Sequence, residues 1–234
     1  MIKKDIIPAF FQASSYWLVL VVIKIFFRLK IDGQENLKEV ENGPIIFASN
    51  HNGYVDGVFA AVSLPRGSLW PQKFFPIHFL GMDRFFSWRY FPINIIYKLG
   101  GVVKITRAKE KKPDNSHLHQ VLAEPIKLLK NGAKIWIHPE GGFNDDGTPK
   151  KPRNGIIFLH QQTKAPIVPV AIIGSDKVLY GNIFTWKAFL NAIKSFLMMN
   201  RVKVVFGKPI YAINDSNLDE NTNFIMNEIY KLKK

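Results

Sequence analysis

The chain has 234 residues, enough for one domain with a full hydrophobic core and a short additional segment. Its 32 Lys and Arg residues outnumber its 18 Asp and Glu residues, and the formal charge of +14 favours anionic partners such as acidic lipid headgroups, nucleic acid or a polyanionic cofactor. The sequence contains no Cys, which excludes disulfides, thiolate metal sites and a cysteine nucleophile.

The first predicted element is an apolar segment at residues 6–27, which follows Lys3 and Lys4. No small-residue cleavage site follows it, so we do not expect a removable signal peptide. Its uninterrupted apolar part, residues 16–23, is shorter than the roughly 20 residues that a membrane span requires. We therefore predict a helix or a pair of helices embedded in one leaflet. A buried soluble helix and a single membrane span are the alternatives.

A strand is predicted at residues 45–48, where an apolar, partly β-branched run is followed by turn-forming residues. His51 and Asp56 come directly after this strand, with four residues between them. A carboxylate next to an imidazole holds the ring in one tautomer and stabilises the imidazolium, which suits general-base catalysis. A structural interpretation is also open, in which His51 caps a turn and Asp56 starts a helix.

A short helix is predicted at residues 58–62, and a strongly aromatic segment follows at residues 70–97. This segment has no clean strand alternation, and it mixes aromatic with basic side chains. Such a composition fits a membrane-interface face, an acyl-chain groove or stacking on single-stranded nucleic acid. Ordinary core packing is the alternative for many of these rings.

Residues 100–106 are predicted to form a strand that ends at Arg107. Residues 116–130 carry a helical stripe of apolar side chains, with Ser116 as the predicted N-cap. This helix contains His117 and His119. Because residues two apart do not share a helix face, we predict no metal site there.

The next predicted strand, at residues 133–138, ends at a block of Pro, Glu and Gly residues. The remaining predicted elements are a helix at 155–162, a strand at 167–173, an amphipathic helix at 184–199, a strand at 201–206 and a helix at 218–232. Strands that alternate with helices predict an α/β fold with a mixed, mostly parallel central sheet flanked by helices. Since sites in such folds gather at the carboxyl ends of the strands, we expect His51, Arg107 and Glu140 to converge.

Four short blocks occur in one order along the chain. They are Asn50-His51-x-x-x-x-Asp56, Gly101 with Arg107 six residues later, Pro139-Glu140-Gly141 behind a strand, and an apolar strand at 165–171 that contains Pro166 and Pro169. Together they resemble the glycerolipid (1-acyl-glycerol-3-phosphate) acyltransferase family, and the resemblance runs from about residue 33 to about residue 209. We therefore expect a membrane-anchoring segment at residues 1–30 and an acyltransferase domain at residues 31–234.

The resemblance implies transfer of a fatty acyl group from an acyl-CoA or acyl-carrier-protein thioester to the hydroxyl of a lysophospholipid such as 1-acyl-glycerol-3-phosphate. His51 would be the general base in a direct attack, and Asp56 would orient it. We expect no cofactor and no metal, because the thioester donor is a co-substrate. The expected location is the cytoplasmic face of the cell membrane, on an anionic lipid surface and without nucleic acid.

The predicted substrate-binding residues are Arg107, Glu140, Gly141, Gly142 and Arg153. The resemblance assigns Arg107 to the acceptor phosphate, for which a guanidinium is well shaped. The chain departs from the family after the third block, where Phe143 follows Gly142 in place of the usual Thr-Arg or Thr-Ser. The acceptor is therefore open between lysophosphatidate, another lysophospholipid and a different lipid alcohol or amine. A non-enzymatic basic protein that binds membranes or nucleic acid is the alternative function.

Overall fold

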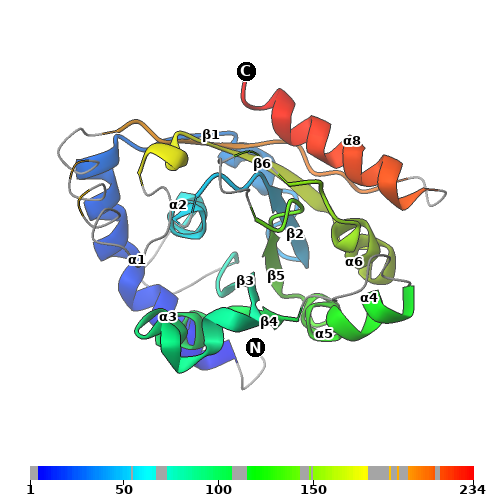
Figure 1. The fold of residues 1–234 in the computed structure, drawn as a ribbon. Helices are drawn as coiled ribbons and strands as arrows, with labels where there is room; N and C mark the ends of the chain where they lie inside the picture. Colours follow the sequence, from blue (N-terminus) through cyan, green and yellow to red (C-terminus); the bar gives the residue numbers. More distant parts are fainter. Residues whose placement is uncertain are drawn as a thin grey trace.

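The computed structural model describes residues 5–53, 55–66, 73–106, 115–142, 148, 150–178, 190, 194, 200–213 and 217–234. Figure 1 shows a central sheet with helices on both sides. The strands are β1 Lys30–Asp32, β2 Ile45–Ser49, β3 Ile77–Met82, β4 Val103–Ile105, β5 Lys134–Ile137, β6 Ile167–Ile173 and β7 Lys203–Phe206. The α-helices are α1 Ile6–Phe27, α2 Asp56–Ser63, α3 Ile93–Leu99, α4 Asn115–Val121, α5 Ala123–Lys130, α6 Gly155–Thr163 and α8 Leu218–Lys231. Short 3₁₀ helices are η2 Gln34–Leu37, η3 Asp83–Phe86, η4 Trp88–Tyr90 and η5 Ser175–Lys177.

The strands form one sheet in the order β1-β7-β6-β2-β5-β3-β4. The five strands β2 to β6 all run in one direction, β7 is antiparallel to β6, and β1 is parallel to β7. The predicted mixed, mostly parallel sheet is confirmed. Because β2 pairs with both β5 and β6, the loops at the carboxyl ends of these three strands lie next to one another.

Alternate side chains of the central strands fill a separate core on each face of the sheet. On β2, Ile45 and Phe47 pack with α1 and α2, whereas Ile46 and Ala48 pack with α5, α6 and α8. The central strands are buried on both faces, which explains their continuous apolar sequences. This double cover makes β2 and its neighbours a rigid base for the loops that follow them.

Some predicted elements differ from the observed ones for local reasons. The helix predicted at 116–130 is two helices, because Pro125 lacks an N–H and its ring would clash with the carbonyl of Val121, the last residue of α4. β3 lies inside the aromatic segment, where the sequence showed no alternation. β1 is a strand of three residues that was not predicted. The helix predicted at 184–199 falls outside the described residues, apart from positions 190 and 194.

The predicted N-terminal helix is confirmed as the single helix α1. One side of it packs on the domain: the Tyr16 hydroxyl donates to the carbonyls of Val62 (3.2 Å) and Leu64 (3.1 Å). The other side is exposed and apolar, with Leu18 70% exposed. By length and composition α1 is able to cross a membrane, a test that core helices and signal sequences also pass.

Candidate active site

The loop after β2 is held against the end of β6 by two asparagine side chains. The Asn50 amide donates to the carbonyl of Ile172 at 2.8 Å and accepts from its N–H at 2.8 Å, as a paired strand residue would. The Asn52 amide donates to the same carbonyl at 2.9 Å. These contacts fix the backbone on either side of His51. The conformation of the loop is therefore set by side-chain hydrogen bonds as well as by the turn preferences of its residues.

His51 and Asp56 form a hydrogen-bonded pair within this loop. The Nδ1 atom of His51 lies 2.8 Å from Oδ2 of Asp56, the first residue of α2. The same oxygen accepts the backbone N–H groups of Asn52 (2.7 Å) and Gly53 (2.9 Å). Because a carboxylate oxygen accepts, the proton of a neutral His51 ring is on Nδ1 and its lone pair is on Nε2. The Asp56 side chain is fully buried, whereas that of His51 is 23% exposed.

Asp56 remains an anion despite its burial. Burial raises the pKa of its carboxyl, but the hydrogen bond and positive charge of His51 outweigh burial, and the pKa of Asp56 is lowered. Oδ1 of Asp56 has no hydrogen-bond partner among the described residues, and the buried Ser175 hydroxyl near it contributes to lowering the pKa. His51 therefore faces a fixed negative charge, as general-base catalysis requires.

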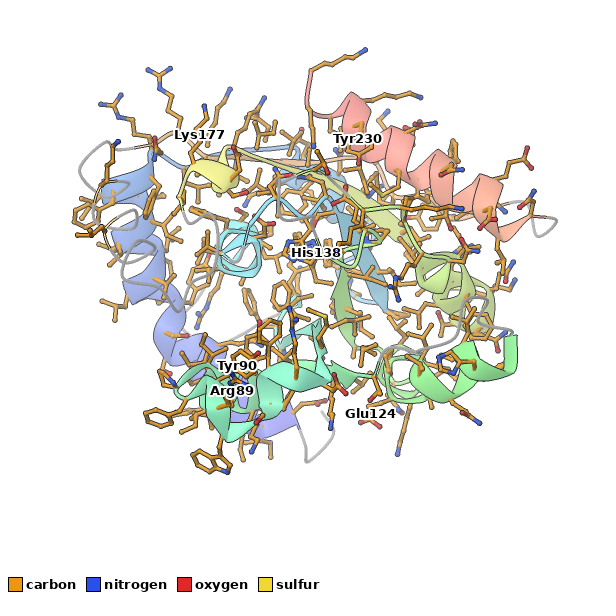
Figure 2. All side chains as sticks on the ribbon, in the orientation of Figure 1. Arg89, Tyr90, Glu124, His138, Lys177 and Tyr230 are labelled. Carbon is orange, nitrogen blue, oxygen red and sulfur yellow. The ribbon has the colours of Figure 1, made fainter. Side chains whose placement is uncertain are left out.

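A second imidazole, from His138, stacks on His51. The ring centroids are 4.3 Å apart and the planes differ by 16°. The His138 Nδ1 atom lies 3.0 Å from the Ser49 hydroxyl and 3.1 Å from the carbonyl of Asn50. Burial, followed by the charge of His51, lowers the pKa of His138 to about 3, so this ring is neutral at neutral pH. Figure 2 shows His138 near the centre of the molecule.

Glu140 connects the loop of His51 to the far end of the chain. Its side chain is 2% exposed. Oε2 accepts the backbone N–H of His51 at 2.9 Å, and Oε1 accepts the hydroxyl of Tyr230, on α8, at 2.7 Å. Burial and the Glu140 carboxylate raise the pKa of Tyr230, so the phenol keeps its proton and donates it.

A family model described as "Acyltransferase" matches residues 28–173, more than half of the chain. The chain belongs to the acyltransferase family. The chain is 28% identical to human 1-acyl-sn-glycerol-3-phosphate acyltransferase beta over 182 residues, 77% of this chain and 56% of the human protein. It is 24% identical to the 1-acyl-sn-glycerol-3-phosphate acyltransferase of Bacillus subtilis (strain 168) over 198 residues, 85% of this chain and 81% of that protein. The chain spans about half the length of the human relative.

The fold is also that of a solved acyltransferase. The crystal structure of the 1-acyl-sn-glycerophosphate (LPA) acyltransferase PlsC from Thermotoga maritima matches with a TM-score of 0.62 and 14% sequence identity. The match covers 95% of this chain and 80% of that one. This match confirms the predicted α/β fold. At 14% identity it does not assign roles to individual residues, and the site is described from the contacts in this structure.

The structure brings the first and third acyltransferase blocks together, through the contact between Glu140 and His51. Gly141 and Gly142 follow Glu140 with φ angles of 62° and 137°, which suit glycine, and the Gly141 N–H donates to the carbonyl of His138 at 2.8 Å. The Arg153 N–H donates to the carbonyl of Pro139 at 2.9 Å, so its backbone adjoins the third block while its side chain is exposed.

Arg107 lies outside the described residues. The strand before it, β4, runs in the same direction as β2 and β5. Within the described part of the chain, no group of three or more His, Asp and Glu residues is placed to hold a metal ion.

Two residues of this site were not predicted from the sequence. His138 was interpreted only as the last residue of a strand, although its place directly before Pro139-Glu140-Gly141 was a signal that it would reach the same edge as His51. Tyr230 lies in a helix at the other end of the chain and carries no local signal. Glu140 was predicted to bind substrate, and that role stays a prediction; in the structure each of its carboxylate oxygens accepts a hydrogen bond from the protein.

Proposed function

We propose that this acyltransferase moves a fatty acyl group from a thioester to the hydroxyl of 1-acyl-glycerol-3-phosphate. The observation that carries the proposal is the 2.8 Å contact between a partly exposed imidazole and a fully buried carboxylate. The proposed acceptor is that of the similar human and Bacillus subtilis proteins, which are 1-acyl-sn-glycerol-3-phosphate acyltransferases. The proposed donor is acyl-CoA or acyl-carrier protein, and both are anionic partners for a chain of charge +14.

The proposed reaction is a direct attack. The lone pair on Nε2 of His51 takes the proton of the acceptor hydroxyl while that oxygen attacks the thioester carbonyl. The C–S bond then breaks, and the proton passes from His51 to the leaving thiolate. Asp56 stabilises the imidazolium between these steps. The chain has no Cys and no Gly-x-Ser-x-Gly motif, which favours this route over a covalent acyl-enzyme.

The stacked ring of His138 supports the same role for His51. An imidazolium next to a second charged ring would be destabilised, but the low pKa of His138 keeps that ring neutral. One face of His51 is thereby covered by an uncharged ring and shielded from water. Shielding favours transfer to the lipid alcohol over hydrolysis of the thioester.

We propose that Arg107 binds the acceptor phosphate, and that Gly141, Gly142 and Arg153 form the adjoining wall of the acceptor site. The backbone hydrogen bond from Arg153 to Pro139 supports the placement of Arg153 next to the third block. The two protein contacts of the Glu140 carboxylate favour a role in holding His51 over direct contact with the acceptor.

We propose that the exposed side of α1 docks in one leaflet on the cytoplasmic face of the membrane, with residues 1–30 as the anchor of the domain at 31–234. Besides Pro8, the buried residues of α1 recur every three or four positions and face the protein: Ala9, Ala13, Tyr16, Leu20, Ile23 and Phe27. A helix with one side packed on a domain cannot be surrounded by lipid, which favours a lying over a spanning helix. Exposed Trp88 (70%), Phe91 (61%) and Ile96 (50%) extend the apolar surface onto η4 and α3, which packs against α1.

Charges on this side of α1 are expected to weaken membrane binding. Leu18 and Val21 are 70% and 53% exposed, and a Leu18→Glu, Val21→Glu variant replaces their apolar surface by carboxylates. Because burying each apolar side chain contributes about 1.5–3 kcal/mol, we expect at least roughly 10-fold weaker binding to vesicles that contain phosphatidylglycerol. Co-flotation measures this, with Phe224→Glu on α8 as the control, since Phe224 is a 46% exposed apolar residue of another helix. Equal binding of the two variants would contradict docking through α1.

Lipid mass spectrometry tests the proposed function. The protein is incubated with a mixture of lysolipids and either acyl-CoA or acyl-carrier protein, and thiol release is measured with and without acceptor. We expect phosphatidate as the main product, and thiol release that depends on lysophosphatidate. A different acylated lipid would replace the proposed acceptor. Thiol release without any acylated lipid would indicate a thioesterase and overturn the proposal.

A further inference from the structure

The last turn of α8 reaches the active site, although α8 lies beyond the residues 28–173 that the family model covers. Figure 1 shows α8 crossing one side of the sheet, and Figure 2 shows Tyr230 at its end. The sequence separation between Tyr230 and Glu140 is 90 residues, and that between Glu140 and His51 is 89. Three distant segments of the chain therefore meet at one carboxylate.

The Glu140 carboxylate is a buried group with one donor on each oxygen. Oε1 accepts from Tyr230 at 2.7 Å and Oε2 accepts from the backbone of His51 at 2.9 Å. A buried carboxylate that loses a donor has to recover a partner by moving or by admitting water. Removal of the Tyr230 hydroxyl would therefore change the position or hydration of the carboxylate. Because Oε2 accepts the N–H of His51, the backbone of His51 would shift with it.

α8 is a firm support for the Tyr230 side chain. Ile225, Met226 and Ile229 are buried in the core on one face of the sheet. At the start of the helix, the Asn217 side chain caps the N–H groups of Asp219 and Glu220. The helix is thus fixed at its beginning and along its inner face, and its last turn holds a constant position relative to the sheet.

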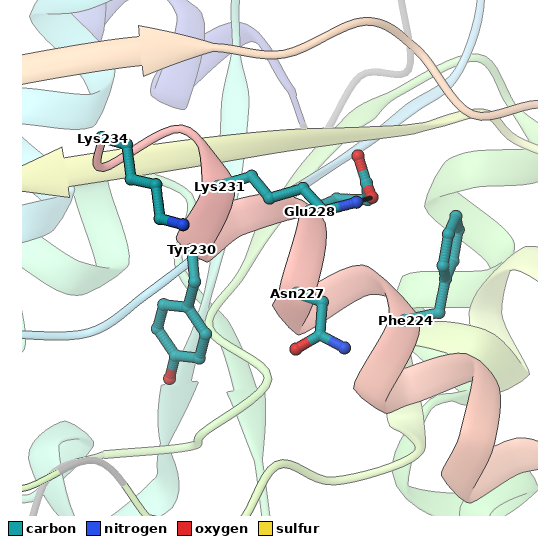
Figure 3. Close-up of a pocket in the computed structure, with 6 residues that line it drawn as sticks. All are labelled: Phe224, Asn227, Glu228, Tyr230, Lys231 and Lys234. Carbon is teal, nitrogen blue, oxygen red and sulfur yellow. Dashed lines mark hydrogen bonds and ion pairs between the residues drawn. The ribbon is translucent and has the colours of Figure 1, made fainter.

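The Tyr230 ring is partly buried and packs against the core on one face of the sheet. It lines a cavity of about 310 Å³ along α8 with Phe224, Asn227, Glu228, Lys231 and Lys234. Figure 3 shows Tyr230 extending from the end of the helix with its hydroxyl directed away from it. The Lys233 ammonium lies 4.7 Å from the ring centroid. A Phe at this position keeps the ring and its contacts, so the substitution tests the hydroxyl alone.

We propose that Tyr230 is a positioning residue for acyl transfer, acting through Glu140 on the backbone of His51. The proposal rests on the proposed role of His51 as general base. The imidazole must meet the acceptor hydroxyl within a narrow range of distance and angle, and a displacement of about 1 Å costs on the order of 10²-fold in rate. The Tyr230–Glu140 pair fixes the backbone from which this imidazole extends, so α8 completes the active site.

A double-mutant cycle tests this inference. We expect Tyr230→Phe to lower kcat roughly 10-fold with the KM values for donor and acceptor unchanged, because the hydroxyl acts on the orientation of His51 and touches no substrate. We expect Glu140→Gln to lower kcat by at least as much. The double variant should be no slower than Glu140→Gln, since Tyr230 has no route to His51 once the carboxylate is lost.

Tyr211→Phe is the matched control, because Tyr211 is an exposed tyrosine near the carboxylate of Glu39. Its neighbour Ile210 pairs with Ile167 at the start of β6, whereas the loop of His51 contacts Ile172 near the other end of that strand. It should retain wild-type kcat. Thermal unfolding of each variant measures folding separately from rate. Multiplicative effects of the two substitutions would overturn the inference, and so would a rise in acceptor KM at constant kcat, which would place Glu140 against the substrate. An inactive wild-type protein would instead overturn the proposed function.

Discussion

The His51→Ala variant is expected to lose about 10³-fold in kcat for acyl transfer, within the range of roughly 10²- to 10⁴-fold that a general base contributes. The lone pair on Nε2 is removed, and the acceptor hydroxyl has to attack with its proton in place. Measurement of thiol release under saturating donor and acceptor tests this expectation. Activity within 10-fold of wild type would contradict a general-base role for His51.

His51→Ala is expected to fold, because the Asp56 carboxylate keeps the N–H groups of Asn52 and Gly53. The loss of one charge-assisted hydrogen bond should lower the free energy of unfolding by about 1.5–3 kcal/mol at pH 7. His119→Ala is the control, since His119 is exposed on α4. This control should keep its kcat, and a similar loss of activity in both variants would point to a non-specific effect of removing an imidazole.

The same variant should also lose less of its stability in acid than the wild type does. In the wild type, the folded pKa of Asp56 lies below its ordinary value of 3.8, so its contribution to stability is present above that value and is lost as the pH falls through the folded pKa. His51 makes the largest contribution to lowering the pKa of Asp56 against the increase that burial causes. Without His51, the folded pKa of Asp56 rises. Less stability is then left for acid to remove, and urea unfolding between pH 7 and pH 3 should show the difference in stability between wild type and variant narrowing as the pH falls below 3.8.

The core of the fold was predictable because it depends on local patterns. β2 and β6 are continuous apolar runs, as expected for strands that are buried on both faces, and β6 was predicted with its observed bounds. The order of these strands along the chain was enough to predict that His51 and Glu140 would meet at one edge of the sheet. β3 was missed because Gly81 and the surrounding aromatic residues give no alternation, and its position is fixed by pairing with β4 and β5.

The contacts that define the site were less predictable than its location. The spacing of His51 and Asp56 was sufficient to predict the pair, because five positions in a loop bring two side chains into range. The stack of His138 on His51 depends on the register of β2 against β5, in which Ala48 is paired with Ile137. The role of Glu140 depends on Tyr230, whose position is set by the packing of α8 on the sheet. No local pattern encodes either contact.

The Asp56→Asn variant separates the charge of the carboxylate from its geometry. An amide oxygen in the place of Oδ2 still accepts the Nδ1–H of His51 and the N–H groups of Asn52 and Gly53. The amide NH₂ then takes the place of Oδ1, which has no hydrogen-bond partner among the described residues and lies near the buried Ser175 hydroxyl. The loop should keep its conformation, while the negative charge is lost.

We expect Asp56→Asn to lower kcat about 10²-fold with little change in KM, because the imidazolium forms only during the reaction and loses its counter-charge. A hydrogen bond to a charged group contributes about 1.5–3 kcal/mol against 0.5–1.5 kcal/mol for a neutral one, and the lost Coulomb attraction in a buried site adds to this difference. Steady-state kinetics with both substrates varied measures the effect.

Asp32→Asn is the control for the loss of a carboxylate, since Asp32 is a surface residue that pairs with Lys203 at 3.0 Å. It should leave kcat unchanged. If Asp56→Asn had the same kcat as this control while His51→Ala was inactive, His51 would act as a base without a neighbouring negative charge. Asp56 would then serve only to fix the conformation of the loop. A rise in KM at constant kcat would instead mean that the carboxylate acts on substrate binding. A lower kcat in Asp56→Asn, with KM unchanged and with normal kcat in Asp32→Asn, is the result expected if the carboxylate stabilises the protonated base during acyl transfer.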